Sequence, residues 1–116
     1  MIGSTRQLSV YALGEHVDMR KGFDGLSALV RDRLLRNPVC GDLFLFVSRN
    51  RKRAKVLVWD GTGLCVYAKR LERGRFACMW ENSSDRTLKL TMTELQLFLE
   101  GSDLVGRVVL SPAAFL

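Results

Sequence analysis

The chain has one histidine, three cysteines and two prolines in 116 residues, and it has no long uninterrupted apolar run. Cys40, Cys65 and Cys78 form no Cys-x-x-Cys pair, so together with His16 they are a poor set of zinc ligands. An odd number of cysteines among apolar neighbours is typical of reduced thiols. No stretch approaches the roughly 18 apolar residues of a membrane span, and no signal peptide is visible. We therefore expect a cytoplasmic protein with no membrane partner and no cofactor.

Groupings of catalytic residues are also scarce. No pair of carboxylates is accompanied by a histidine, a nucleophile elbow or a glycine loop for phosphates, so we do not expect an enzyme. Asp18, Asp24 and Asp60 stand nearest to motif-like surroundings, and three carboxylates could hold Mg²⁺ for phosphodiester cleavage. Asp18 and Asp24 also suit a helix start, and Asp60 suits a turn. A metal-dependent nuclease is therefore an alternative that Mg²⁺-dependent cleavage would test, and we predict no metal site.

Basic residues, by contrast, are abundant and concentrated in one part of the chain. The segment from Asp18 to Arg75 has fourteen of the eighteen Lys and Arg residues and six carboxylates, a net charge of +8, while the rest of the chain has −2. A concentrated positive field on a folded domain attracts a polyanion, and nucleic acid is the commonest such partner. The charge pattern therefore predicts a nucleic-acid-binding surface.

The basic residues gather in three clusters, which precede the first predicted helix, occupy the first predicted hairpin and surround a later turn. The candidate nucleic-acid-binding residues are Arg20, Lys21, Arg49, Arg51, Lys52, Arg53, Lys55, Lys69, Arg70, Arg73 and Arg75. A basic hairpin tip can follow a phosphate backbone without burying its charge, yet a single basic turn is more often a solvated surface. Arg20 could instead pair with a neighbouring acid. Whether the three clusters share one face depends on the fold.

The hydrophobic pattern predicts one small α+β domain over residues 1–116, with an antiparallel sheet, one main helix and a short C-terminal helix. Apolar residues recur at helical spacing from Phe23 to Leu34, and Asn37-Pro38 is expected to end the main helix. Thr93 is the expected N-cap of the second helix, with Gln96 completing a capping box and Gly101 ending it. The expected strands are Leu8–Leu13, Leu43–Val47, Ala54–Trp59, Leu64–Ala68, Arg75–Trp80 and Thr87–Leu90.

Within this sheet, the three runs between residues 43 and 68 are expected to form a meander, and Asp60-Gly61 is a favourable hairpin turn. Phe44, Phe46 and Phe76 are expected in the core. Trp59 lies near the Asp-Gly turn and Tyr67 lies shortly before Lys69, so they could either pack in the core or stack on bases.

Three runs, in this order, carry a resemblance to a known family: residues 18–26 (DMRKGFDGL), 59–65 (WDGTGLC) and 68–76 (AKRLERGRF). The chain resembles the small accessory protein of the bacterial insertion-sequence-sixty-six family from about Val10 to about Asp103. The resemblance implies a protein encoded beside a separate, larger transposase and required with it for efficient movement of the element. It carries over no catalytic residues. The chain departs from the family pattern after Phe76, and the tail 104–116 is idiosyncratic.

Two functions fit these observations. The leading hypothesis is DNA binding, mostly to phosphates, through the eleven basic residues named above. The competing hypothesis is a protein-interaction module in which the same arginines face an acidic surface of the transposase, because arginine suits interface hot spots as well as phosphates. In that case the apolar Val108–Leu116 tail would be an anchor. The same tail could pack on the domain or on a second copy, so a homo-oligomer also stays open.

Overall fold

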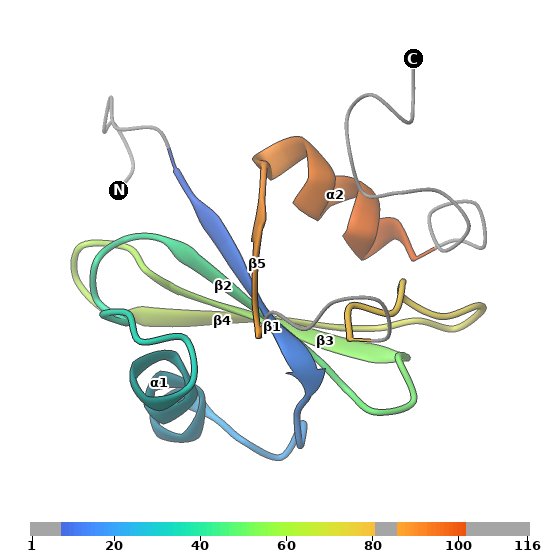
Figure 1. Ribbon diagram of the computed structural model, residues 1–116, viewed down its shortest axis with the longest axis horizontal. Coiled ribbons are helices and arrows are strands. Elements are labelled where there is room, and N and C mark those ends of the chain that lie inside the picture. Colours follow the sequence, from blue (N-terminus) through green and yellow to red (C-terminus); the bar gives the residue numbers. More distant parts are fainter. Residues whose placement is uncertain (1–7, 81–85, 102–116) are drawn as a thin grey trace.

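The computed structural model describes residues 8–80 and 86–101, which form a five-stranded sheet and two helices (Figure 1). In chain order the elements are β1 (Val10–His16), α1 (Phe23–Asp32), β2 (Leu43–Val47), β3 (Arg53–Trp59), β4 (Leu64–Arg70), β5 (Thr87–Leu90) and α2 (Met92–Glu100). The expected tail, Val108–Leu116, lies outside the described residues.

The strands are ordered β4-β3-β2-β1-β5 across the sheet. β2, β3 and β4 form the expected antiparallel meander, and β5 is antiparallel to β1. β1 and β2 are parallel, however, so the expectation of a wholly antiparallel sheet is wrong at this one pair. A parallel pair needs a long crossover connection, which here contains α1. The α+β class is supported by a sheet that is mostly antiparallel.

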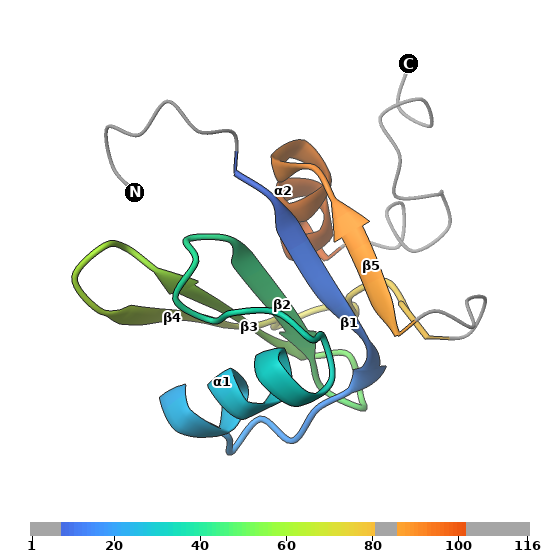
Figure 2. The same cartoon turned by 60° about the vertical axis from the view of Figure 1, so that its left-hand side comes forward.

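The two helices pack on opposite faces of the sheet (Figure 2). Because side chains alternate along a strand, neighbouring residues enter different cores. On β2, Phe44 and Phe46 are buried with Leu26 of α1, while Leu45 and Val47 belong to the core that contains Phe98 of α2. The helices have 10 and 9 residues, so the distinction between a main and a short helix is not supported. Neither is long and apolar enough to cross a membrane.

β1 continues beyond its predicted end at Leu13. It passes through Gly14 to His16, and its register with β2 shifts between Ala12 and His16. The Gly14 N–H donates to the carbonyl oxygen of Arg86 at 2.6 Å, so this glycine still takes part in the pairing. A glycine inside a strand often marks such an irregularity and does not end the strand.

α1 ends at Asp32, five residues before the predicted stop at Asn37. The chain turns because Leu35 adopts a left-handed conformation, with φ of 56°, and the Arg36 N–H donates to the carbonyl oxygen of Val30 at 3.0 Å. Glycine is the usual residue at a left-handed position that follows a helix C-terminus. Leu34 is nevertheless buried against the same core as α1, which explains why the apolar pattern extends past the helix.

Replacing Leu35 with glycine is expected to stabilise the protein by about 1 kcal/mol. The Leu35 side chain is 81% exposed, so little packing is lost, and glycine has no Cβ to oppose the left-handed conformation. Urea unfolding of Leu35→Gly beside wild type measures the change. Leu35→Ala is the matched control, because it removes the same exposed side chain but keeps the Cβ; a gain of equal size in that variant would contradict the backbone explanation.

The strand predicted at Arg75–Trp80 is wrong. This segment is irregular, and Phe76, Ala77 and Met79 are all buried. Phe76 stacks on Phe98 of α2 with ring centroids 5.2 Å apart. The apolar residues therefore fill the space between the sheet and α2. Three of the four residues 76–79 are buried, which resembles a strand in the sequence, but they are buried by α2 and not by pairing with another strand.

The predicted N-cap of α2 at Thr93 is also wrong, because Thr91 occupies that position. The Thr91 hydroxyl accepts a hydrogen bond from the Glu94 N–H at 3.0 Å, and a Glu94 carboxylate oxygen accepts one from the Thr91 N–H at 2.9 Å. Both threonines have a suitable partner three residues later, but a carboxylate also interacts favourably with the helix dipole. Gly101 ends the helix as predicted, with φ of 57°, and a Cβ there would overlap the side chain of Leu71.

The β3–β4 turn is held together by Asp60. Its Oδ1 accepts hydrogen bonds from the backbone N–H groups of Thr62 and Gly63 and from the Thr62 hydroxyl, at 2.8 to 2.9 Å. These bonds, chiefly those from the Thr62 and Gly63 N–H groups, lower the pKa of the Asp60 carboxyl to about 2. Gly61 has φ of 102°, a positive value that glycine adopts without steric cost.

Because folding lowers the pKa of Asp60, its charge stabilises the folded state above pH 4, and that contribution is lost as the pH falls through about 2. In Asp60→Asn the side chain keeps an acceptor oxygen but does not titrate. We expect the variant to be less stable at pH 7 and the difference from wild type to shrink between pH 4 and pH 2. Thermal unfolding of both proteins across this range measures the difference. A constant difference would show that the carboxylate charge does not matter.

Candidate nucleic-acid interface

The structure brings the second and third basic clusters side by side. The β2–β3 hairpin contains the second cluster, and the end of β4 with the chain that leaves it contains the third. The Leu71 N–H donates to the carbonyl oxygen of Lys52 at 2.8 Å, and the Phe76 N–H donates to that of Arg51 at 2.7 Å. The returning segment is thus bonded along the hairpin, and its residues Arg73 and Arg75 are exposed beside it.

Two polar side chains hold the β2–β3 turn. Asn50 Oδ1 accepts hydrogen bonds from the Ser48 hydroxyl at 2.8 Å and from the Lys52 N–H at 3.0 Å. The Ser48 oxygen in turn accepts one from the Arg53 N–H at 3.1 Å. Arg51 has a left-handed φ of 60° in this turn. Because short polar residues close the turn, the longer basic side chains are not needed for it, and Arg49, Lys52 and Arg53 are exposed.

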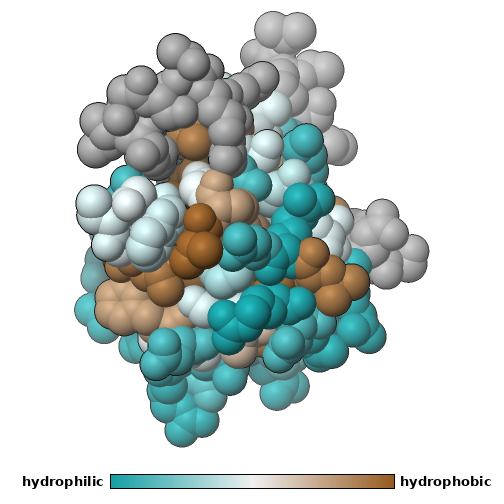
Figure 3. Space-filling view, turned by 90° about the vertical axis from the view of Figure 1, so that its left-hand side faces the viewer, coloured by the Kyte–Doolittle hydropathy of each residue, from teal (hydrophilic) through white to brown (hydrophobic). Residues whose placement is uncertain are grey.

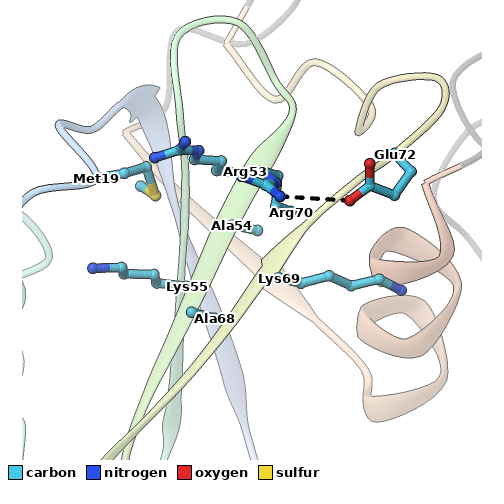
Figure 4. A pocket seen from close by; sticks show the side chains of 8 residues that line it. All are labelled: Met19, Arg53, Ala54, Lys55, Ala68, Lys69, Arg70 and Glu72. Atoms are coloured by element: carbon cyan, nitrogen blue, oxygen red, sulfur yellow. Dashed lines mark ion pairs between the residues drawn. The ribbon is translucent and has the colours of Figure 1, made fainter.

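A cleft of about 510 Å³ lies beside this hairpin (Figure 4). We call it the basic cleft. It is bordered by Met19, Arg53, Ala54, Lys55, Ala68, Lys69, Arg70 and Glu72. Glu72 is the one carboxylate in this lining, and its oxygen lies 3.7 Å from Arg70 Nη2 with both side chains well exposed. An exposed pair of this kind is worth little, so the cleft keeps most of its positive charge.

Arg53 and Arg70 are direct partners in the β3–β4 register. Side chains of directly opposed strand residues project from the same face with Cβ atoms about 5 Å apart, and like charges in that position are destabilising. Lys55 lies two residues along β3 and therefore projects from this face too. Three cations thus lie on one side of the hairpin, and their mutual repulsion destabilises the sheet.

A second cleft, of about 550 Å³, adjoins the first. Its lining comprises Met19, Ser48, Arg49, Asn50 and Arg53, so Met19 and Arg53 border both clefts. Sequence reasoning missed Met19, whose only signal was its place in the 18–26 motif. It also missed Ala68, a small residue that leaves room between the longer side chains of β3 and β4.

Two lysines of the candidate set make structural hydrogen bonds. Lys55 Nζ donates to the carbonyl oxygen of Lys21 at 2.9 Å, which fixes the chain before α1 above β3. Lys69 extends away from Arg53 and Lys55 (Figure 4), and its Nζ donates to the carbonyl oxygen of Leu99 at 2.6 Å. A cation at the C-terminal end of a helix is favourable. Lys69 therefore contributes its charge to α2, on the opposite face of the sheet from Arg53.

Arg20 is paired with an acid, the alternative considered for it from sequence. Its guanidinium and its backbone N–H donate to the Asp18 carboxylate at 2.6 to 3.1 Å. These bonds to Arg20 hold the pKa of Asp18 well below its usual range and raise that of Arg20. The charge of Arg20 is thus largely compensated, although its side chain is 91% exposed.

Two of the three acids considered for a nuclease make local interactions. Asp18 binds Arg20, and Asp60 closes the β3–β4 turn. Within residues 8–80 and 86–101, no three His, Cys, Asp or Glu side chains lie close enough to hold a metal ion. The structure gives this alternative no geometric support.

Comparison with known proteins gives a consistent result. The model of the family described as IS66 Orf2-like protein matches residues 8–107. Two relatives from Sinorhizobium fredii, the uncharacterized proteins y4jC and y4hO, are 37% and 36% identical to the chain over 103 residues. Each match covers 89% of this chain and 86% or 88% of the relative. No solved structure matches.

Proposed function

This chain belongs to the IS66 Orf2-like family, whose members have an accessory role in transposition, and we propose that it binds DNA phosphates through the basic cleft and has no catalytic activity. Arg53, Lys55 and Arg70 make the central contacts, and Arg49, Lys52, Arg73 and Arg75 extend them along the hairpin and the returning segment. It acts in the cytoplasm, where a transposase of the same element reaches the DNA.

The placement of Arg53 opposite Arg70 is the observation that carries this proposal. Two guanidinium groups on one face cost free energy in the unbound protein, whereas a phosphate between them would remove the repulsion and accept charge-assisted hydrogen bonds. Arginine suits this task because its planar donors match phosphate oxygens in pairs. Contacts of this kind fix the protein on the duplex without reading its sequence.

The side of the molecule that carries the β3–β4 turn is also better suited to a polar partner than to a large apolar one. Figure 3 shows that hydrophobic areas are broken up by hydrophilic ones on the side that carries the β3–β4 turn, and that hydrophilic surface prevails in the lower part, where α1 lies. Binding to the transposase is the competing function. It is favoured by two isolated apolar side chains after α1, Leu35 and Val39, which are 81% and 45% exposed.

Fluorescence anisotropy of the full chain tests the proposal, with labelled duplexes that carry the ends of the element or scrambled sequences of the same length. We expect binding that weakens steeply as salt rises, because phosphate contacts release counterions. Preference for the element ends would add sequence recognition to the phosphate contacts. Absence of binding near physiological salt would overturn the proposal, and co-purification with the transposase would then test the competing function.

A further inference from the structure

β4 is an edge strand with few of the features that normally protect such edges. Within the described part of the chain it pairs only with β3, and it lies at the margin of the sheet (Figure 2). Its seven residues contain no proline, its register has no bulge, and its charges, Lys69 and Arg70, are confined to one end. Natural proteins usually interrupt or cover a long, regular edge, because its unpaired backbone groups invite another strand.

The hydrogen bonds of the hairpin show which backbone groups face outward. The Asp60 N–H donates to Gly63 and the Leu71 N–H donates to Lys52, at the two ends of an unbroken register. Hydrogen-bonded pairs alternate along an antiparallel ladder. Counting from either end, the backbone groups that bond to β3 are those of Cys65, Tyr67 and Lys69. The N–H and C=O groups of the alternate residues therefore point away from the sheet; these residues are Leu64, Val66, Ala68 and Arg70.

We infer that this edge pairs with β4 of a second copy of the chain, antiparallel and centred on Tyr67. In that register Val66 lies opposite Ala68, and Leu64 lies opposite Arg70, so all four outward residues of each copy find partners. Lys69 lies opposite Cys65. No cation therefore faces another cation, although each strand carries two.

Tyr67 supports the choice of centre. Its side chain is 53% exposed on the face of the sheet opposite the basic cleft, and it would meet its own counterpart at the two-fold axis. A directly opposed aromatic pair of this kind stabilises antiparallel strands. Shifting the centre to Lys69 would instead oppose two lysines, which is unfavourable. The edge is thus self-complementary in only a few registers, and the Tyr67 register uses its exposed aromatic residue.

The two-fold axis of such a pair is perpendicular to the sheet, so both copies present the same face to the same side. Arg53, Lys55 and Arg70 of each copy then lie on one side of a continuous ten-stranded sheet. A dimer would double the number of phosphate contacts available to one duplex. The pairing itself does not depend on DNA binding, and it is tested without DNA.

Sedimentation velocity of the full chain, at concentrations from 1 to 100 µM, is the first test. We expect a species of twice the 13.1 kDa chain mass. Ala68→Pro removes an outward N–H without removing a bond to β3, because proline is tolerated on the open side of an edge strand. We expect this variant to raise the dimer dissociation constant at least about tenfold, a loss of about 1.4 kcal/mol. Ala68→Ser, which keeps the N–H, is the matched control and should dimerise normally.

Circular dichroism and thermal unfolding establish that Ala68→Pro is folded. A wild-type protein that stays monomeric at 100 µM overturns the inference, and so does a dimer that a folded Ala68→Pro variant leaves unchanged, since another surface must then form it. If the proline variant does not fold, Ala68→Lys replaces it. The lysine places a third cation on the strand near the axis and should also weaken the dimer.

Cross-linking tests the register. Directly opposed residues of a non-hydrogen-bonded pair have Cα atoms about 4.5 Å apart, within disulfide range. Tyr67→Cys in a Cys65→Ser background should therefore oxidise to a covalent dimer. Wild type is the control, because its Cys65 lies opposite Lys69 and not opposite another cysteine. A dimer that cross-links through wild-type Cys65 but not through residue 67 would overturn the Tyr67 centre.

Discussion

Replacing Phe98 with alanine is expected to lower the free energy of unfolding by about 3–5 kcal/mol. Phe98 is fully buried between α2 and the sheet, and its ring stacks on Phe76 at 5.2 Å with an interplanar angle of 11°. The substitution leaves a cavity in a core that α2 covers, and the ring of Phe76 loses its partner. Urea unfolding followed by circular dichroism measures the loss.

Gln96→Ala is the control for this prediction, since Gln96 is exposed on the same helix and its replacement should change the free energy of unfolding by less than about 0.5 kcal/mol. The double variant Phe76→Ala, Phe98→Ala is informative as well. Because each ring is the other's partner, the combined loss should be smaller than the sum of the single losses. Equal effects of Phe98→Ala and Gln96→Ala would mean that α2 does not dock as the structure shows.

Neutralising the basic cleft with Arg53→Gln, Lys55→Gln and Arg70→Gln is expected to weaken DNA binding at least about tenfold at physiological salt. If each side chain neutralises one phosphate, the slope of log K against log salt becomes shallower by roughly 3. The loss should be the same for element ends and scrambled duplexes, because phosphate contacts carry no sequence information. The anisotropy titration described above measures both quantities.

The matched control removes three other cations, with Arg36→Gln, Arg86→Gln and Lys89→Gln. Arg36 and Lys89 lie at the ring of Tyr11 on β1, and Arg86 precedes β5, so these side chains are near the sheet edge opposite β4. Both variants have the same net charge. If they lose affinity equally, general electrostatic attraction explains binding and the basic cleft has no special role.

Local signals in the sequence predicted most strands well. The bounds of β2 and β5 are as predicted, and β3 and β4 differ only by extensions of one and two residues, because alternating apolar residues and the Asp60-Gly61 turn are both local features. The parallel pairing of β1 with β2 is not local, since it joins segments separated by α1. The strand predicted at Arg75–Trp80 was wrong for a similar reason. Its apolar residues reflect contacts with α2, which follows much later in the chain.

The candidate site was predictable as a set of residues but not as a surface. Alternation along β3 places Arg53 and Lys55 on one face, whereas joining Arg70 to them requires the β3–β4 register. Adjacent Lys69 consequently projects from the other face and bonds to Leu99. Pairing of Arg20 with a neighbouring acid was one of two alternatives considered from sequence, and the side-chain geometry identifies that acid as Asp18.

β1 lies between β2 and β5 in the sheet, so one of its two neighbours is synthesised much later than β1 itself. β1 is translated first among the strands, yet one of its edges has no partner until β5 is translated, some seventy residues later. Until Thr87–Leu90 leaves the ribosome, that edge is open and the core later covered by α2 is exposed. Domains generally fold as units during synthesis. A truncated product ending before β5 should therefore be a target for aggregation or proteolysis, and would not be a smaller working protein.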